Sequence, residues 1–387
     1  MSSRLLVLSS QLDPAPGPLE EIRRQIKAGV DWESFIGSSA LEGVAPLVYR
    51  NLKPFAFLLP PVVVGRLREL YVMNSVRNIG LFRQLAPLLD ALRTSGFTTA
   101  LTKGARLAPS VYGDAGLRPF TDVDLFIHPD SWSALEGFLV ERGFRKRSSV
   151  SAAWDPKDRR RGWLYSPYYS RGRLLLELHP NTLGLHAPSA AEDDFWEDRR
   201  DMALDGGTAS VLSPEYELCY LCLHAQQHSY SRLIWLTDIA ALSRKAGISW
   251  KKVAWICREE KITASVRHGL HLARLLWPDS VPEGVMDGLP VSSMENRMLR
   301  FFWPESRIVG RLPVPHFPFY MPTILSLLAR KDVRLLGHAI GGVCFPPRWW
   351  MAHSYGVPER SAGMYLLYAR RLFRPVWLAV KHVLRAA

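Results

Sequence analysis

Residues 101–127 read LTKGARLAPSVYGDAGLRPFTDVDLFI, and this stretch decides the fold. It begins at the end of Phe97–Leu101, a β-branched and aromatic segment whose propensity predicts a strand. A short helix is expected over Ala105–Tyr112, followed by a glycine-rich loop. Thr121–Ile127 alternates polar and apolar residues before it becomes fully apolar, which predicts a second strand. The order of strand, glycine, helix and strand therefore predicts a small α/β core.

Two carboxylates stand close together in the second predicted strand. Residues two apart on a strand share a face, so Asp122 and Asp124 are expected side by side. Such a pair repels unless it shares a proton or holds a cation. Glu177 supplies a third acid from a further predicted strand, Arg173–His179. Because Mg²⁺ prefers oxygen ligands and substrate phosphates, the pattern predicts a site for two metal ions (Mg²⁺ or Mn²⁺).

The step Lys103-Gly104 lies between the first predicted strand and the short helix. The first N–H groups of a helix have no partner within it and are suited to binding phosphate. Gly104 has no side chain to prevent close approach of a ligand to the backbone, and Lys103 adds a positive charge. We therefore interpret this step as a phosphate-binding loop.

Two further residues flank these motifs. Arg118 lies in the loop before the second strand, where it either reaches a triphosphate or fixes the loop through a salt bridge. His179 shares the strand face of Glu177, so it either orients Glu177, contacts substrate or makes a structural hydrogen bond. The sequence leaves these alternatives open.

Residues 101–132, LTKGARLAPSVYGDAGLRPFTDVDLFIHPDSW, resemble the core motif "LKG…l…y…g.R…DiDllv" of the bacterial nucleotidyltransferase-like proteins. This family is a divergent branch of the DNA polymerase β nucleotidyltransferase superfamily. Three other stretches resemble the same family, namely DWESFIGSSALEGVAPLVYRNL, LLLELHPNTL and LSPEYELCYLCLHAQQHSYSRLIWLTDIA. The resemblance covers most of residues 30–245.

The resemblance implies an α+β fold with a small mixed-sheet, polymerase β-like core. That core is expected over 97–185, between an N-terminal helical region at 1–96 and a C-terminal helical region at 186–387. The chain from about Trp196 onward is expected to be mostly helical, with a strong helix start at Ser213-Pro214.

The resemblance also implies roles for individual residues. Gly104 corresponds to the phosphate-loop glycine, Asp122 and Asp124 to the metal-binding pair, and Glu177 to the third carboxylate. The chain departs from the wider superfamily at Lys103, because Gly-Gly or Gly-Ser is usual at this step.

The implied reaction is transfer of a nucleoside monophosphate from an NTP, with ATP as the first candidate, to an acceptor, with release of pyrophosphate. The acceptor classes are a small molecule, a peptide or protein, and an RNA end. One alternative is a catalytically silent nucleotide-binding or adaptor protein, which the unusual Lys103-Gly104 favours. A second alternative is a protein that binds RNA ends through basic segments.

The charge of the chain is concentrated in two segments. The chain has 49 Lys and Arg against 36 Asp and Glu, a net charge of +13. Gly143–Arg173 carries nine basic and two acidic residues, and the residues after Glu359 carry six basic residues and no acid, so these segments account for the whole excess. Because Gly143–Arg173 connects the Asp124 strand to the Glu177 strand, we expect it to border the cleft and attract phosphate.

Cys219, Cys222, His224 and His228 resemble a set of zinc ligands by type. They all fall on one predicted helix, however, and four ligands on a single short helix cannot enclose a tetrahedral ion. We therefore expect the two cysteines to be core residues. His224 and His228 are one turn apart, and we hypothesise that they face the nucleotide cleft.

No segment has the features of a membrane span or a secretion signal. The longest stretch without Asp, Glu, Lys or Arg, Leu312–Ala329, is interrupted by four prolines. The apolar run near the N-terminus is too short for a signal peptide, and four unpaired-looking cysteines fit a reducing compartment. We expect a cytoplasmic protein.

Overall fold

The computed structural model describes most of the chain, including the whole candidate site. The described residues are 2–147, 168–179, 183, 190–204, 206–245, 247–310, 337, 341, 345, 348–358, 360–370 and 373. Much of the basic segment Gly143–Arg173 lies outside them, as does most of the basic segment after Glu359.

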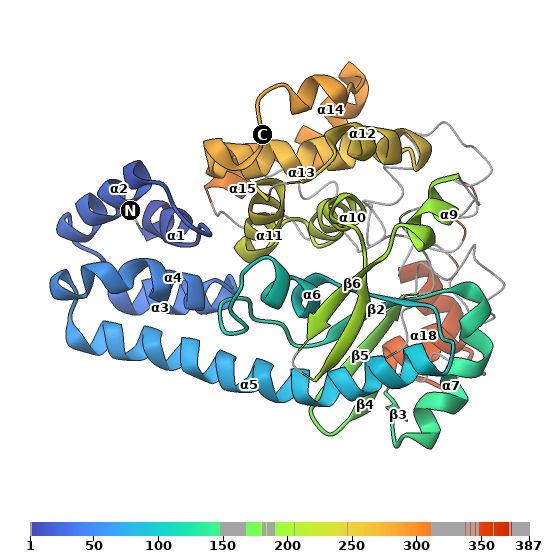
Figure 1. Cartoon of the computed structure of the whole chain (residues 1–387). Coiled ribbons are helices and arrows are strands. Elements are labelled where there is room, and N and C mark those ends of the chain that lie inside the picture. The colour runs from blue at the N-terminus through green and yellow to red at the C-terminus, as the bar shows by residue number, and fades with distance from the viewer. Residues whose placement is uncertain are drawn as a thin grey trace.

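In the described part of the chain, a seven-stranded mixed sheet forms the centre of the fold (Figure 1). Its middle strands are parallel β2 and β5, and β1 joins β2 antiparallel and β7 parallel. The remaining pairs, β3–β4, β4–β5 and β6–β7, are antiparallel. The order across the sheet is β3 (Arg145–Lys146), β4 (Tyr168–Arg171), β5 (Leu174–His179), β2 (Val123–Ile127), β1 (Thr99–Thr102), β7 (Gly207–Val211) and β6 (Arg200–Leu204).

The two faces of the sheet belong to two hydrophobic cores. Val123, Leu125 and Ile127 of β2 lie in a core with the second half of α5 (Pro61–Thr94) and α7 (Trp132–Glu141). Phe126 points to the other face, into the core that contains the helices on the opposite side. Since side chains alternate along a strand, Asp124 shares the face of Phe126.

Five helices precede the sheet: α1 (Ser2–Ser9), α2 (Pro16–Lys27), α3 (Trp32–Leu41), α4 (Ala45–Leu52) and α5. Asp31 caps α3, with its side chain accepting a hydrogen bond from the Ser34 N–H. α5 starts at Pro61, continues through Pro87 and ends before Gly96, which has φ +79°. It runs from the N-terminal helices to the sheet (Figure 1).

Further helices follow the sheet along the described chain. They are α10 (Pro214–Gln227), α11 (Leu233–Ser243), α12 (Trp250–Glu259), α13 (Thr263–Leu276), α14 (Ser293–Phe302), α15 (Glu305–Val309) and α18 (Arg348–Tyr355). Two other helices, α6 (Lys103–Ser110) and α9 (Ala190–Glu197), occur between strands of the sheet. In Figure 1, α10 and α11 lie between the sheet and α13. α10 therefore contacts both the sheet region and the outer helices.

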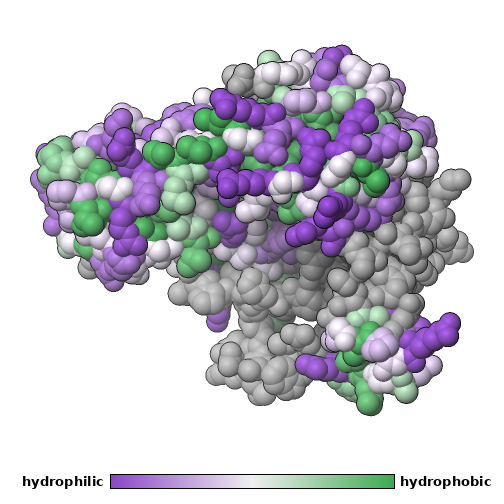
Figure 2. Space-filling view, turned by 90° about the horizontal axis from the view of Figure 1, so that it is seen from below, coloured by the Kyte–Doolittle hydropathy of each residue, from purple (hydrophilic) through white to green (hydrophobic). Residues whose placement is uncertain are grey.

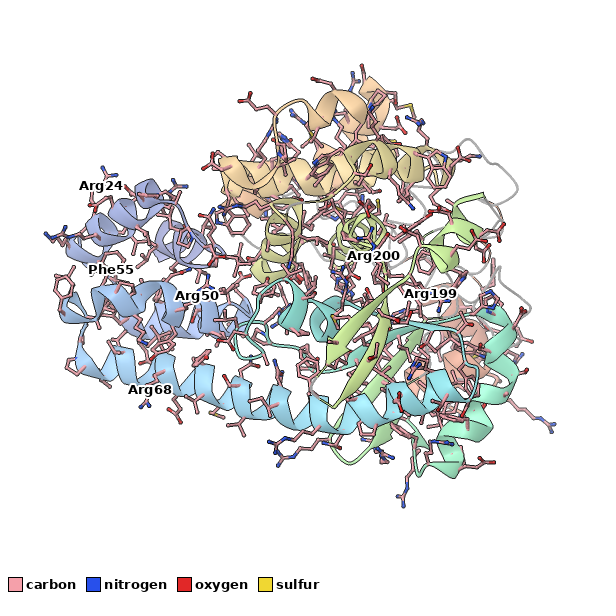
Figure 3. All side chains as sticks on the ribbon, viewed as in Figure 1. Arg24, Arg50, Phe55, Arg68, Arg199 and Arg200 are labelled. Atoms are coloured by element: carbon pink, nitrogen blue, oxygen red, sulfur yellow. The ribbon has the colours of Figure 1, made fainter. Side chains whose placement is uncertain are left out.

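The α+β class, with a mixed sheet flanked by helical regions, is confirmed. One part of the expected organisation needs correction, because the chain after Trp196 is not mostly helical at first: residues 200–211 form the β6–β7 hairpin. Arg199 anchors this hairpin by donating a hydrogen bond to the Thr99 carbonyl at 3.1 Å (Figure 3). The division at residues 96 and 185 stays a prediction, and the sheet draws strands from both sides of residue 185.

The surface carries scattered hydrophobic side chains. Val62, Met73 and Val76 on α5 are exposed. On the face seen in Figure 2, hydrophobic and hydrophilic surfaces are interspersed. Within the described residues, no helix has the length and hydrophobicity needed to cross a bilayer.

Candidate active site

Three potential metal ligands meet where β2 and β5 lie side by side. The parallel register places Asp124 opposite Glu177 and Phe126 opposite His179. Because Leu174, Leu176 and Leu178 occupy the core on the far face, Glu177 and His179 point to the face of Asp124. One ligand atom from each of Asp124, Glu177 and His179 lies within 4.8 Å of the other two. The sequence prediction that Asp124 and Glu177 lie on neighbouring strands is therefore confirmed.

Lys103 supplies a cation to this group. Its Nζ lies 2.6 Å from Oδ1 of Asp124 and 5.4 Å from the centre of the Tyr220 ring, and the lysine is only 7% exposed. Burial alone would lower the pKa of Lys103, but Asp124, Tyr220 and Glu177 together raise it well above its usual range. Lys103 therefore stays charged inside the protein.

The backbone at Lys103 is strained. Its φ is +52°, in the left-handed region that glycine adopts easily and lysine rarely does. Strain of this kind persists only where surrounding contacts fix it, and it is concentrated at functional sites. Here the contacts are the ion pair with Asp124 and a 2.9 Å hydrogen bond from the Lys103 N–H to the Glu217 carboxylate.

The pKa values of the two carboxylates, Asp124 and Glu177, shift in opposite directions. Burial would raise the pKa of Asp124, but the Lys103 charge and a 2.9 Å hydrogen bond with His179 Nε2 hold it well below its usual range. Burial raises the pKa of Glu177, and the neighbouring Asp124 charge adds to this effect, while His179 and Lys103 oppose it. Asp124 is thus a permanent anion, whereas Glu177 is the better proton acceptor of the two near neutral pH.

Tyr168 adds a contact to Glu177 that the sequence did not indicate. The two residues are opposite each other in the β4–β5 register. Burial raises the pKa of Tyr168, and the charges of Glu177 and Asp122 and a hydrogen bond with Glu177 raise it further. Tyr168 therefore stays protonated beside the site.

Asp122 takes a different position from the one expected. β2 begins at Val123, so Asp122 stands one residue before the strand. Its Oδ1 accepts a hydrogen bond from the Thr121 hydroxyl at 3.1 Å, and it is not among the three clustered ligands. Its charge nevertheless contributes to the raised pKa of Tyr168.

Gly104 is required by packing. A Cβ at this position would lie 2.4 Å from Cβ of Phe120 and 3.0 Å from an Arg118 nitrogen. The helix start beside it is also partly satisfied within the protein, because Glu217 accepts hydrogen bonds from the Lys103 N–H and the Thr102 hydroxyl. A role of Gly104 in binding phosphate stays a prediction.

Arg118 forms a buried salt bridge. Its guanidinium lies 2.6 Å from Asp238 of α11, which is fully buried and also accepts a 2.6 Å hydrogen bond from the Tyr112 hydroxyl. Burial would lower the pKa of Arg118, but Asp238 raises it. Of the two alternatives for Arg118, the structure supplies the loop-fixing salt bridge, while a contact with triphosphate stays a prediction.

α5 fixes the loop that leads into β2. Asn74 donates a 2.7 Å hydrogen bond to the Gly116 carbonyl, and Asn78 donates to the carbonyls of Ala115 and Arg118 at 2.6 and 3.0 Å. A Cβ at Gly116 would lie 2.0 Å from the Ser75 hydroxyl oxygen, so this loop approaches the helix too closely for another residue without rearrangement. The long helix thereby determines where β2, the strand of Asp124, begins.

A row of aromatic and histidine rings extends from the carboxylates along α10. The ring centres of His179 and Tyr220 are 6.0 Å apart, and those of Tyr220 and His224 are 6.3 Å apart. His224 is 4.6 Å from His228, and both lie about 5 Å from Trp235. Burial, the Lys103 charge and His228 hold the pKa of His224 well below its usual range, so His224 is neutral at pH 7.

Cys219 and Cys222 are core residues, as expected. Both are fully buried, and interaction with the Cys257 thiol together with burial raises the pKa of Cys219 well above its usual range. A Cβ at Gly269 of α13 would lie 3.0 Å from the Cys222 sulfur, so α10 and α13 approach each other closely here.

Glu217, Tyr220 and Asp238 were not singled out from the sequence. A signal for two of them was present: Glu217, Tyr220 and His224 are spaced by three and four residues and therefore share one face of α10. That face turns toward Lys103, while Cys219 and Cys222 face the core.

Comparison with known proteins identifies one family. The family described as "Uncharacterised nucleotidyltransferase" matches residues 28–278. No curated protein matches the chain. Among solved structures, an antigenic nucleotidyltransferase-like protein from Paracoccidioides brasiliensis is similar at 18% identity and a TM-score of 0.33, covering 59% of this chain and 97% of its own.

Proposed function

Since this chain belongs to the uncharacterised nucleotidyltransferase family, we propose that it transfers a nucleoside monophosphate from an NTP, first of all ATP, to an acceptor and releases pyrophosphate. The observation that carries the proposal is the meeting of Asp124, Glu177 and His179 beside a buried lysine. We assign the chain to the polymerase β superfamily on its D-x-D motif and place the reaction in the cytoplasm.

The donor set fits a divalent metal. The two carboxylates are suitable ligands for Mg²⁺ or Mn²⁺, whereas the imidazole suits softer divalent ions, and the Lys103 ammonium 2.6 Å from Asp124 already places positive charge in the group. Asp124, Glu177 and His179 would hold the ion, and Asp122, one residue before β2, would contribute a further carboxylate. When bound, two such ions would stabilise the negative charge that develops on the triphosphate and the acceptor oxygen.

Each residue of the candidate site has its own role in the proposed reaction. Glu177, on the strand beside Asp124, accepts the proton of the acceptor hydroxyl. Asp124 stays ionised, and His179 orients it through their 2.9 Å hydrogen bond. Lys103 provides the permanent cation for phosphate oxygens. Gly104 and Arg118 shape the loop, as their contacts with Phe120 and Asp238 indicate.

The ring row on α10 is suited to a nucleobase. Tyr220, His224, His228 and Trp235 offer neighbouring aromatic faces that continue from Lys103, and every base has a π-face to stack on them. The neutral His224 can also accept a hydrogen bond from an exocyclic amine, such as that of adenine.

The test is transfer of label from α-labelled NTP in the presence of Mg²⁺ and a cell extract. We expect Asp124→Asn to abolish transfer, whereas Asp201→Asn, the same change on an exposed residue of β6, leaves it intact. Transfer that is equal in both variants would contradict the proposal. The molecular-weight class that takes the label separates a small molecule, a protein and an RNA end.

A second candidate, a catalytically silent nucleotide-binding protein, is favoured by the same Lys103. Its ammonium lies where it competes with a metal ion for Asp124. This candidate predicts NTP binding without release of pyrophosphate. Measuring both quantities on the same sample decides between the two functions.

A further inference from the structure

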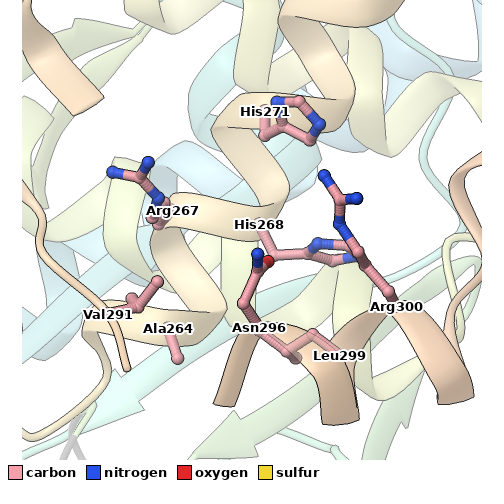
Figure 4. Close-up of a pocket in the computed structure, with 8 residues that line it drawn as sticks. All are labelled: Ala264, Arg267, His268, His271, Val291, Asn296, Leu299 and Arg300. Carbon is pink, nitrogen blue, oxygen red and sulfur yellow. The ribbon is translucent and has the colours of Figure 1, made fainter. Parts of the chain in front are cut away.

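A small pocket between α13 and α14 contains none of the candidate active-site residues (Figure 4). Its charged side chains are engaged within the chain. Arg300 and His271 lie 3.0 and 3.2 Å from the Glu305 carboxylate, and Arg267 donates to backbone carbonyls. His268 is buried beside them. The Glu305 contacts join α13, α14 and α15, so packing within one chain explains these side chains.

The outward face of α5 is not explained in this way. Among the scattered hydrophobic side chains of the surface, Val72, Met73, Val76 and Ile79 of α5 are 42% to 67% exposed. Their spacing of three and four residues places them on one stripe of the helix. The solvent face of a surface helix is normally polar or charged. In Figure 1 the first half of α5 forms the lower edge of the view, so another molecule can reach this stripe.

Gly80 continues the stripe, although packing within the chain does not require a glycine there. It lies one turn after Val76, and a Cβ at this position would have no atom of the described chain within 4 Å. Glycine inside a helix is less stable than alanine. Its presence is explained if a side chain of another molecule packs closely against the helix at this point.

Two opposite charges stand at equal distances from the middle of the stripe. Glu69 lies seven residues before Val76 and Arg83 seven residues after it, each about 10 Å away along the helix. Seven residues are nearly two turns, so the three residues lie almost in line. Both charged residues are exposed. Within the described chain, the ion pairs of α5 involve other residues, namely Arg66 with Glu33 and Arg93 with Asp90.

This order of residues is complementary to itself. A two-fold axis that passes through Val76, perpendicular to α5, places two copies of the helix antiparallel. Glu69 of each copy then lies level with Arg83 of the other, and Gly80 lies level with Val72, so the smallest residue of the stripe meets a branched one. In a parallel pair, Glu69 would face Glu69 and Arg83 would face Arg83, which is unfavourable.

We propose that α5 pairs antiparallel with α5 of a second copy of this chain, with Val76 at the two-fold axis. Burial of the apolar stripe stabilises the dimer, and the two contacts between Glu69 and Arg83 set its register and orientation. A single helix pair is a small interface, so we expect a dissociation constant in about the micromolar range.

The first test is sedimentation of the full chain over about 1–100 μM, which brackets the expected dissociation constant. We expect a reversible equilibrium of monomer and dimer. Val76→Arg brings two like charges together at the axis and should weaken the dimer at least about tenfold. Val140→Arg, the same change on an exposed residue of α7, should leave it within about twofold. A monomer at every concentration, or equal effects of the two variants, would overturn the proposal.

Charge reversal tests the orientation. Glu69→Arg should weaken the dimer at least about tenfold, because each contact then joins two arginines. Adding Arg83→Glu should restore the affinity to within about threefold, since opposite charges again face each other. The two positions are about 21 Å apart on one helix, so this recovery cannot arise within one chain.

Glu259→Arg is the control for net charge. It lies on an exposed residue of α12 and should leave dimerisation within about twofold. All three charged positions are exposed, so the variants should fold normally. A double variant that dimerises as weakly as Glu69→Arg alone, or a control that is equally weak, would refute the antiparallel pair.

Discussion

The Lys103 ammonium and the Asp124 carboxylate form a buried ion pair, with Nζ 2.6 Å from Oδ1. Each residue is less than a tenth exposed. Burying two charges is costly, and the cost is offset only while both partners are present. Replacing only one residue of this pair is therefore expected to lower the stability of the fold as well as to change the candidate site.

Asp124→Asn should lower the free energy of unfolding by about 3–5 kcal/mol, because it leaves the Lys103 charge buried without a partner. Adding Lys103→Met should restore part of this loss. Urea unfolding of the single and double variants measures the coupling. The exposed pair Arg93–Asp90, 2.8 Å apart, is the control and should change stability by less than about 1 kcal/mol. If the double variant is no more stable than Asp124→Asn, the pair is not coupled as described.

Gly104→Ala should destabilise the protein by about 1–3 kcal/mol or more, because the new Cβ would overlap Cβ of Phe120 at 2.4 Å. Gly137→Ala, within α7 and with no atom within 4 Å of the new Cβ, should instead stabilise it by about 0.5–1 kcal/mol. Thermal unfolding of the Gly104→Ala and Gly137→Ala variants measures both changes in stability. Equal effects of the two substitutions would mean that Gly104 has no packing role.

Arg118→Lys should lower stability by about 1–3 kcal/mol, because lysine cannot reproduce the guanidinium contacts with Asp238. On the proposed function, its KM for NTP should stay within about twofold of the original. The same change at Arg83, exposed on α5, should alter neither quantity. A raised KM with unchanged stability would instead assign Arg118 to the triphosphate.

Acid should destabilise the fold through His268. The pKa of His268 is about 3 in the folded chain, against an ordinary value of about 6.5 when unfolded. Between these values the unfolded chain binds a proton that the folded chain does not, so stability falls as pH falls, by up to about 1.4 kcal/mol per unit. Urea unfolding between about pH 7.5 and 4.5 should show a shallower slope for His268→Gln than for His128→Gln. An unchanged slope in His268→Gln would contradict this assignment.

Local sequence features predicted the helices and the central strands well. The Asp31 cap, the proline start of α5 and its glycine end each act through neighbouring residues, so they can be identified without tertiary structure. The β6–β7 hairpin was missed although the dipeptide Asp205-Gly206 is a common hairpin turn. Its strands are short and carry few β-branched residues, so propensity alone did not distinguish them.

The site was predictable where it depends on strand periodicity and on a known motif, as for Asp124 and Glu177. It was not predictable where it depends on distant partners. Asp238 lies 120 residues after Arg118, and Glu217 lies 114 residues after Lys103. Such pairs form because separate elements pack together, and no local pattern of residues reports that packing.

The contact between Thr102 and Glu217 has a consequence for synthesis on the ribosome. These residues are 115 positions apart. At about 5–20 residues per second, translation needs roughly 6–23 seconds to proceed from one to the other. During that interval the nascent Lys103 loop has no α10 to close it, so a chain interrupted before Glu217 lacks the acceptor that holds this turn in its left-handed conformation. The loop can therefore reach its final shape only late in the production of each molecule.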